Sequence, residues 1–135
     1  MKEKLIDLKK IVLLIFPMLL LFLGGCKNSK EEQMRHIVIF KYKPSATEEQ
    51  IESVTTALGD LKNEIPGIIF FEHGINDSPE NKNNGFTHVY QFTFEDADAR
   101  DTYLPHPEHQ KFGEMLGEME IVEDVFVVDY APVHK

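Results

Sequence analysis

Apolar residues in this chain form one long uncharged run near the N-terminus and several shorter stretches from residue 35 onward. Four of the shorter stretches are rich in β-branched and aromatic residues, a composition typical of β-strands. Strands are therefore predicted over residues 35–43, 68–75, 86–95 and 123–130.

Helical spacing marks the segments between these strands. A capping box begins at Thr47, and Pro66-Gly67 ends the first segment. A shorter helix is predicted over residues 96–104, and another begins at Pro107. The order strand, helix, strand, strand, helix, strand is that of the ferredoxin-like split unit. The expected fold is therefore α+β, an antiparallel sheet with helices on one face.

The predicted strands are apolar on both faces, although helices on one side cover only one of them. In the first strand, Ile37 and Ile39 alternate with a second row of largely apolar residues, His36, Val38, Phe40 and Tyr42. An antiparallel sheet with one wet face should instead alternate apolar and polar residues. A second copy of the chain, related by a two-fold axis, is the simplest cover for the other face, so a homodimer is expected.

The long apolar run belongs to a segment that differs from the rest of the chain. Residues 1–10 hold four lysines against two acidic residues, and residues 11–23 carry no charge. A helix of that length rises only about 20 Å, which is too short to cross a bilayer core. A basic start, a short apolar run and small residues after it are typical of a secretory signal, predicted here over residues 1–25.

Cys26 is the single cysteine of the chain, and it directly follows Leu23-Gly24-Gly25. This sequence resembles the bacterial lipobox, in which the cysteine becomes the first residue of the mature protein and carries the lipid. The resemblance implies a lipoprotein anchored to a membrane of the cell envelope and facing away from the cytoplasm. Residues 26–34 are then a polar tether, and residues 35–132 form the domain.

The acidic charge of the domain argues against two kinds of binding partner. Without residues 1–25 the chain loses 4 of its 14 basic and 2 of its 23 acidic residues, so 10 basic and 21 acidic residues remain. Nucleic acids and anionic membrane surfaces attract basic footprints, so this acidic domain is not expected to bind either electrostatically.

Several short motifs together resemble the stress-responsive A/B barrel, or Dabb, domain. They occur in family order at residues 35–41, 65–67, 85–89, 103–109 and 127–130. The resemblance implies a dimeric α+β barrel. One branch of the family closes linear polyketides by aldol condensation, without a cofactor.

That branch also implies roles for particular residues. His109 matches its general base and Tyr103 the partner of that base, while His36 and His88 match histidines that bind the ligand. The chemistry is coherent, because imidazole titrates near neutrality and a tyrosine hydroxyl can donate to a developing enolate. The chain departs from the cyclase pattern at Leu58, where that branch has a tyrosine in its pocket.

Other interpretations of these histidines stay open. His36 and His88 share strand positions with apolar residues, where a histidine is more often a hydrogen-bonded core group than a catalyst. His106 and His109 lie three residues apart at the start of a helix, a spacing that two metal ligands can share, although no metal is expected. His106 otherwise belongs to a turn or to a ligand site.

The sequence thus predicts a lipid-anchored homodimer that holds a small apolar or aromatic molecule. The alternatives are a cofactor-free lyase or cyclase, with His109 as base and Tyr103 as donor, and a non-catalytic structural stress protein.

Overall fold

The computed structural model describes residues 32–133, so the predicted signal segment, Cys26 and most of the tether lie outside the described residues. No helix among residues 32–133 is both long and apolar enough to span a membrane. The elements, in chain order, are β1 (Met34–Tyr42), α2 (Glu48–Glu64), β2 (Ile68–Ile75), β3 (His88–Phe94), α3 (Ala97–Tyr103), α4 (Pro107–Met119) and β4 (Val122–Tyr130).

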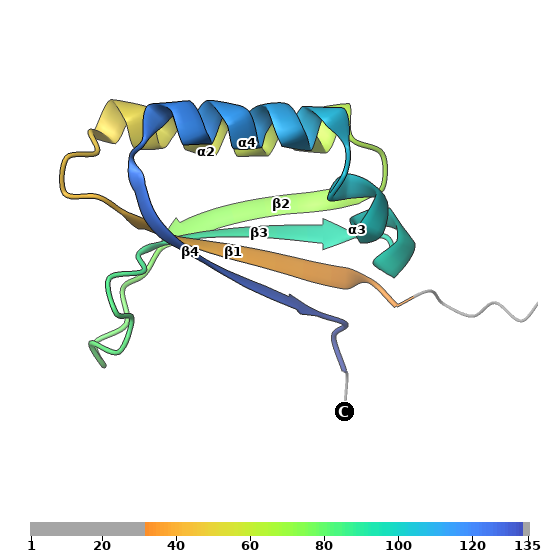
Figure 1. Ribbon diagram of the computed structural model, residues 1–135. Helices are drawn as coiled ribbons and strands as arrows, with labels where there is room; N and C mark the ends of the chain where they lie inside the picture. The colour runs from red at the N-terminus through yellow and green to blue at the C-terminus, as the bar shows by residue number, and fades with distance from the viewer. Residues whose placement is uncertain (1–31, 134–135) are drawn as a thin grey trace, which may run out of the picture. The chain divides into compact units, whose positions relative to one another are not determined.

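The four strands form one antiparallel sheet in the order β2-β3-β1-β4. The first strand is therefore central: His36 lies opposite Phe92 of β3 on one side and opposite Asp129 of β4 on the other. The long helices α2 and α4 pack together over one face of the sheet, and the short α3 lies at one end (Figure 1). The predicted ferredoxin-like α+β fold is confirmed.

Local signals set the ends of the helices as expected. The Thr47 hydroxyl accepts from the Gln50 amide at 3.2 Å, and the Gln50 side chain accepts from the Thr47 amide at 2.9 Å, which completes the capping box. Asp96 caps α3 by accepting from the Ala99 amide at 2.7 Å. Strand β3 begins two residues later than predicted, because the Phe86 amide donates to the Asn83 carbonyl and closes a turn.

Gly67 allows the chain to pass close to α3. Its φ of +88° is in the left-handed region, and a Cβ atom built there would lie 2.6 Å from the Cβ atom of Ala99. The turn between α2 and β2 therefore packs tightly against the helix that carries Tyr103.

Aromatic side chains fill most of the space between the sheet and the helices. Phe40, Tyr90, Phe92 and Phe94 are almost fully buried there. The Tyr90 hydroxyl is hydrogen-bonded to the hydroxyls of Tyr42, at 3.1 Å, and Thr55, at 3.0 Å. Because the polar end of this large side chain has its partners, the core beneath α2 is both closely packed and satisfied.

The opposite face of the sheet carries many apolar side chains, and no helix of residues 32–133 lies over it (Figure 1). Side chains alternate across a strand, so the neighbours of the core-facing residues point to this face. Three large side chains on it remain about half exposed in the monomer: Phe70, Phe126 and Tyr130.

Candidate functional site

Three of the predicted site residues meet at the α3 end of the sheet. The rings of Tyr103 and His109 have centroids 4.2 Å apart and are inclined by 37°. The His36 ring lies 5.7 Å from that of Tyr103, in an edge-on arrangement. The group therefore combines one residue from each of β1, α3 and α4.

His109 is held in one orientation by the backbone. Its Nδ1 atom lies 3.0 Å from the carbonyl oxygen of Leu104. A carbonyl only accepts, so in the neutral ring Nδ1 carries the proton and Nε2 carries the lone pair. This tautomer suits a general base that takes a proton through Nε2.

Tyr103 is suited to donate a proton or a hydrogen bond. Its side chain is 1% exposed, and burial raises the pKa of its hydroxyl above the ordinary value of 10.0. The phenol is therefore protonated at neutral pH. Burial is the only cause of this shift, and no hydrogen bond from another described residue contributes to it.

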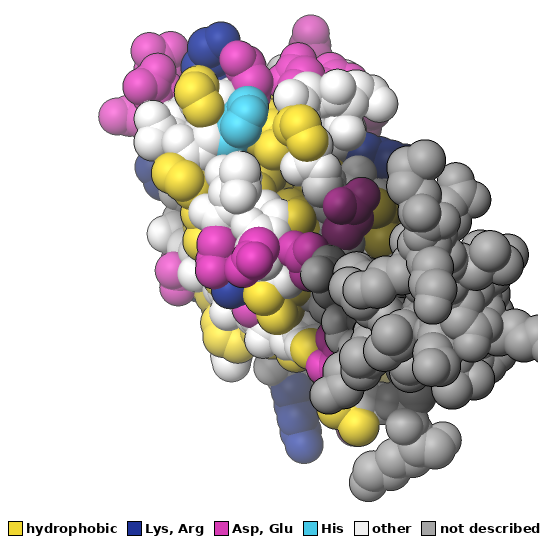
Figure 2. Space-filling model, turned by 90° about the vertical axis from the view of Figure 1, so that its right-hand side faces the viewer, with side chains coloured by type: hydrophobic (Ala, Val, Ile, Leu, Met, Phe, Trp, Pro, Cys, Tyr) yellow, Lys and Arg dark blue, Asp and Glu magenta, His cyan; other side chains and the backbone are white. Residues whose placement is uncertain are grey.

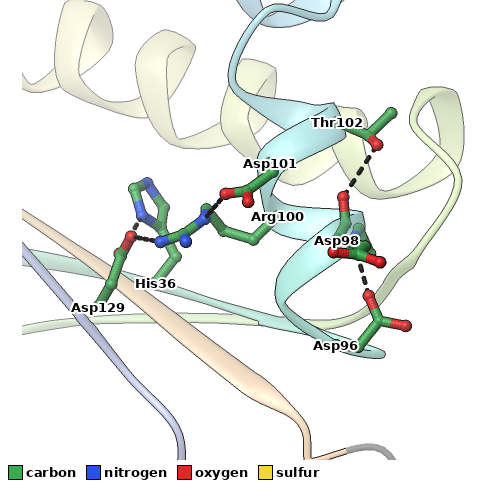
Figure 3. A network of polar contacts seen from close by, with 8 residues as sticks. His36, Asp96, Asp98, Arg100, Asp101, Thr102 and Asp129 are labelled. Atoms are coloured by element: carbon green, nitrogen blue, oxygen red, sulfur yellow. Dashed lines mark hydrogen bonds and ion pairs between the residues drawn. The ribbon is translucent and has the colours of Figure 1, made fainter.

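His36 belongs to a chain of charged partners (Figure 3). Its Nδ1 lies 2.6 Å from one carboxylate oxygen of Asp129, and the other oxygen accepts from Arg100. Arg100 also donates to Asp101 at 2.7 Å. Burial lowers the pKa of His36, which is 4% exposed, while the bond to Asp129 opposes that shift.

The other two predicted histidines have different surroundings. His106 is the N-cap of α4, with its Nδ1 accepting from the Glu108 amide at 3.3 Å. His88 packs edge-on against Tyr42 and lies opposite Phe40, four residues along β1 from His36. That separation is about 13 Å, so the structure does not bring His88 into the group around Tyr103.

Sequence reasoning did not find Asp129 and Arg100 as members of this site. The only local signal was an acidic residue inside an otherwise apolar strand, residues 125–130. The partners of Asp129 come from β1 and α3, and they follow only from the strand register and the helix packing.

An apolar strip lies beside this polar group. Val125 and Val127 of β4 pair with Phe40 and Val38, so they share the face that the helices cover. They nevertheless remain 42% and 50% exposed, because β4 is an edge strand. The strip leads along β4 to Asp129 and His36, and it can hold the apolar part of a ligand.

A separate hollow of about 290 Å³ lies on the opposite face of the sheet. Its floor is apolar, and the loop between β2 and β3 forms its polar rim. It is lined by Ile39, Asn76, Lys82, Asn83, Asn84, Phe86, Val89 and Phe126. None of the predicted site residues contributes to it.

Within residues 32–133, no three His, Cys, Asp or Glu side chains are placed to hold one metal ion. His106 and His109, the pair with ligand spacing, both use Nδ1 in local hydrogen bonds.

The buried histidines make stability depend on pH. The pKa of His36 in the folded protein lies below the ordinary 6.5, so the unfolded chain binds the extra proton first as the pH falls. The contribution of neutral His36 to the stability of the fold is therefore fully present above pH 6.5 and is lost as the pH falls below it. Burial also lowers the pKa of His88, which acts in the same direction.

We therefore expect His36→Gln to make the free energy of unfolding depend less steeply on pH below 6.5, as measured by urea titration. The exposed His73 provides the control, because His73→Gln should retain the wild-type slope. Equal slopes for His36→Gln and wild type would contradict the expectation.

Comparisons with known proteins identify the family and the fold of the chain. The family model for the stress responsive A/B barrel domain matches residues 34–132. Olivetolic acid cyclase from Cannabis sativa is 30% identical over 99 residues, which cover 73% of this chain and 96% of the cyclase.

Two solved structures share the fold. Hydroxynitrile lyase from Passiflora edulis superposes with a TM-score of 0.70 at 26% identity, covering 77% of this chain and 96% of the lyase. A dimeric ferredoxin-like protein from Jannaschia sp. CCS1 gives 0.63 at 29% identity, covering 74% and 99%. With the family model spanning most of its length, the chain belongs to the stress-responsive A/B barrel domain family.

Proposed function

We propose that the protein binds a small apolar or aromatic molecule at the group formed by His36, Tyr103 and His109. One observation carries this proposal: a protonated hydroxyl and an oriented imidazole lie next to exposed apolar side chains of β4. Ligand sites of this kind combine an apolar surface with a few convergent polar groups. The described core beneath α2 is filled, with Leu58 2% exposed, which favours a compact ligand over one with a long tail.

The surrounding charge disfavours an anionic ligand. Acidic side chains are spread over the end of the molecule at which α3 lies (Figure 2). They include Glu95, Asp96, Asp98 and Asp101 in the sequence of α3 and its flank. Anionic ligands would approach against this field.

A second function, that of a cofactor-free lyase or cyclase, is favoured by the tautomer of His109. With Nδ1 bound to the Leu104 carbonyl, Nε2 can take a proton from a substrate while Tyr103 donates to the oxygen that gains charge. The names of two similar proteins, a cyclase and a hydroxynitrile lyase, support chemistry of this type. Cleavage of a hydroxynitrile needs a base for the hydroxyl proton and an acid for the departing cyanide.

We further propose that the protein is a homodimer. The uncovered apolar face of the sheet and the dimeric state of a similar protein from Jannaschia support this. A second copy laid on this face would bury side chains such as Phe70 and Phe126.

Lipid attachment at Cys26 completes the proposal. It rests on the lipobox-like sequence and on the short uncharged run before it. The acyl chains would hold the domain at a membrane of the cell envelope, on the side away from the cytoplasm. The acidity of the domain is compatible with that address, because the lipid rather than surface charge provides the attachment.

We expect His109→Ala to abolish ligand binding while lowering the melting temperature by less than about 4 °C, because the bond it removes is exposed. Binding of neutral phenols and of an aromatic hydroxynitrile is measured by thermal shift. Cleavage of the hydroxynitrile is measured by the release of its aldehyde. Gln110→Ala, one residue along the same helix, is the matched control and should leave both readouts unchanged. A loss of about 1–3 kcal/mol in His109→Ala, with no probe shifting the wild-type melting curve, would instead support the structural role.

Phe126→Glu is expected to convert the dimer to a monomer, because it places a charge on the apolar face of the sheet that the second copy would cover. Analytical ultracentrifugation at micromolar concentration measures this. The control is Ile75→Glu, which should remain dimeric. Ile75 is exposed, and it pairs with His88 on the face of the sheet that the helices cover. A monomeric wild-type domain would refute the dimer.

Cys26→Ser should move the protein from the membrane fraction of bacterial cells to the soluble fraction, and it should abolish incorporation of labelled palmitate. Ser29→Ala, in the tether, serves as the control that keeps both properties. Labelling that survives in Cys26→Ser would disprove attachment at this residue.

A further inference from the structure

Arg100 links α3, the helix that carries Tyr103, to Asp129 of β4, which is bonded to His36 of β1. Its guanidinium donates to Asp129 of β4 and to Asp101 of its own helix, and its side chain is 19% exposed. Asp129 in turn accepts from His36 of β1 through its other carboxylate oxygen, at 2.6 Å. Three elements that are far apart in the sequence are thus tied through one carboxylate (Figure 3).

The two carboxylate oxygens of Asp129 have different partners, and this affects the protonation of His36. A carboxylate beside an imidazole normally favours the imidazolium form. Here the guanidinium, which is always charged, compensates the same carboxylate. Asp129 can therefore orient the ring through Nδ1 without holding a second proton on it, and Nε2 remains unprotonated.

The same contact fixes the helix. Helix α3 has only seven residues, so its position depends on tertiary contacts rather than on its own stability. Arg100 and Tyr103 are three residues apart and lie on the same side of the helix. Holding Arg100 against Asp129 therefore also holds Tyr103 next to His36 and His109.

We propose that Arg100 is a positioning residue, which acts through Asp129 to fix His36 in the neutral form with Nε2 free, beside the Tyr103–His109 pair. This role rests on the proposed function, because His36 is useful in that form only if a ligand is bound there. The motifs of the chain assign no role to Arg100.

The groups that face His36 set the direction of the expected change. They are Asp129 from β4, Arg100 and Tyr103 from α3, and His109 from α4, with the rings of Phe92 and Phe94 from β3. Burial is the largest influence and lowers the pKa of His36; Asp129 raises it, and His109 and Arg100 lower it further. Removing the guanidinium leaves Asp129 uncompensated, so the pKa of His36 must rise.

The test is an NMR titration of histidine side chains labelled with ¹⁵N, in the chain without residues 1–25 and without any ligand. In Arg100→Gln the midpoint of His36 should shift upward, and the imidazolium form should persist to higher pH than in wild type. Arg35→Gln is the matched control: it changes the other arginine of the chain, which is bonded to Gln33, and should leave the His36 midpoint unchanged.

Two further variants keep the test decisive. In an Asp129→Asn background, Arg100→Gln should produce a smaller shift than in wild type, because only the direct effect of the guanidinium charge on His36 remains once the carboxylate is gone. If Arg100→Gln does not fold, Arg100→Lys takes its place. The pKa of His36 should then rise slightly, because the ammonium keeps the positive charge but lacks the planar fork that reaches both carboxylates. An unchanged His36 midpoint in a folded Arg100 variant, or an equal shift with and without Asp129, would overturn the proposal.

The outcome is separable from that of the proposed function. If no phenol or hydroxynitrile binds the wild-type protein but the His36 midpoint moves as expected, the site proposal fails while the link from Arg100 to His36 stands. If the probes bind and the midpoint does not move, only the role of Arg100 is wrong.

Discussion

The register between β1 and β4 is the constraint on which the candidate site depends. It places Asp129 directly opposite His36, and it turns Val127 and Val125 to the same face as Val38 and Phe40. A slip of one residue would turn the carboxylate and both valines to the other face of the sheet. The irregularity in this pairing falls between Lys41 and Tyr42, at the far end from His36, so it leaves the pairing at the site regular.

Burial and charge then give the three ring-bearing residues different chemistry. Tyr103 is kept protonated by burial, and His109 is kept in one tautomer by a backbone carbonyl. His36 is kept neutral by burial and by an arginine that shares its carboxylate partner. A donor and two acceptors thus face one small region next to an apolar strip. Such a division of acid and base roles is what proton transfer without a cofactor requires.

The two faces of the sheet serve different purposes. The helix side holds an aromatic core that ends at the candidate site. The opposite side is apolar and uncovered, and its hollow is bordered by the loop between β2 and β3. In a domain of about a hundred residues, the candidate site and the proposed dimer surface thus lie on opposite faces of the sheet.

The sequence by itself determined the elements, their caps and the fold class, because helix and strand periodicity and capping signals are local. The resemblance to the A/B barrel family implied the pairing of Tyr103 with His109, and their rings do lie together in the structure. Only the tertiary structure decided that Asp129, 93 residues from His36, and Arg100 belong to the site, and that His88 lies away from it. Contacts of that kind depend on which strands are neighbours and in which register they pair, and no local pattern of residues encodes either.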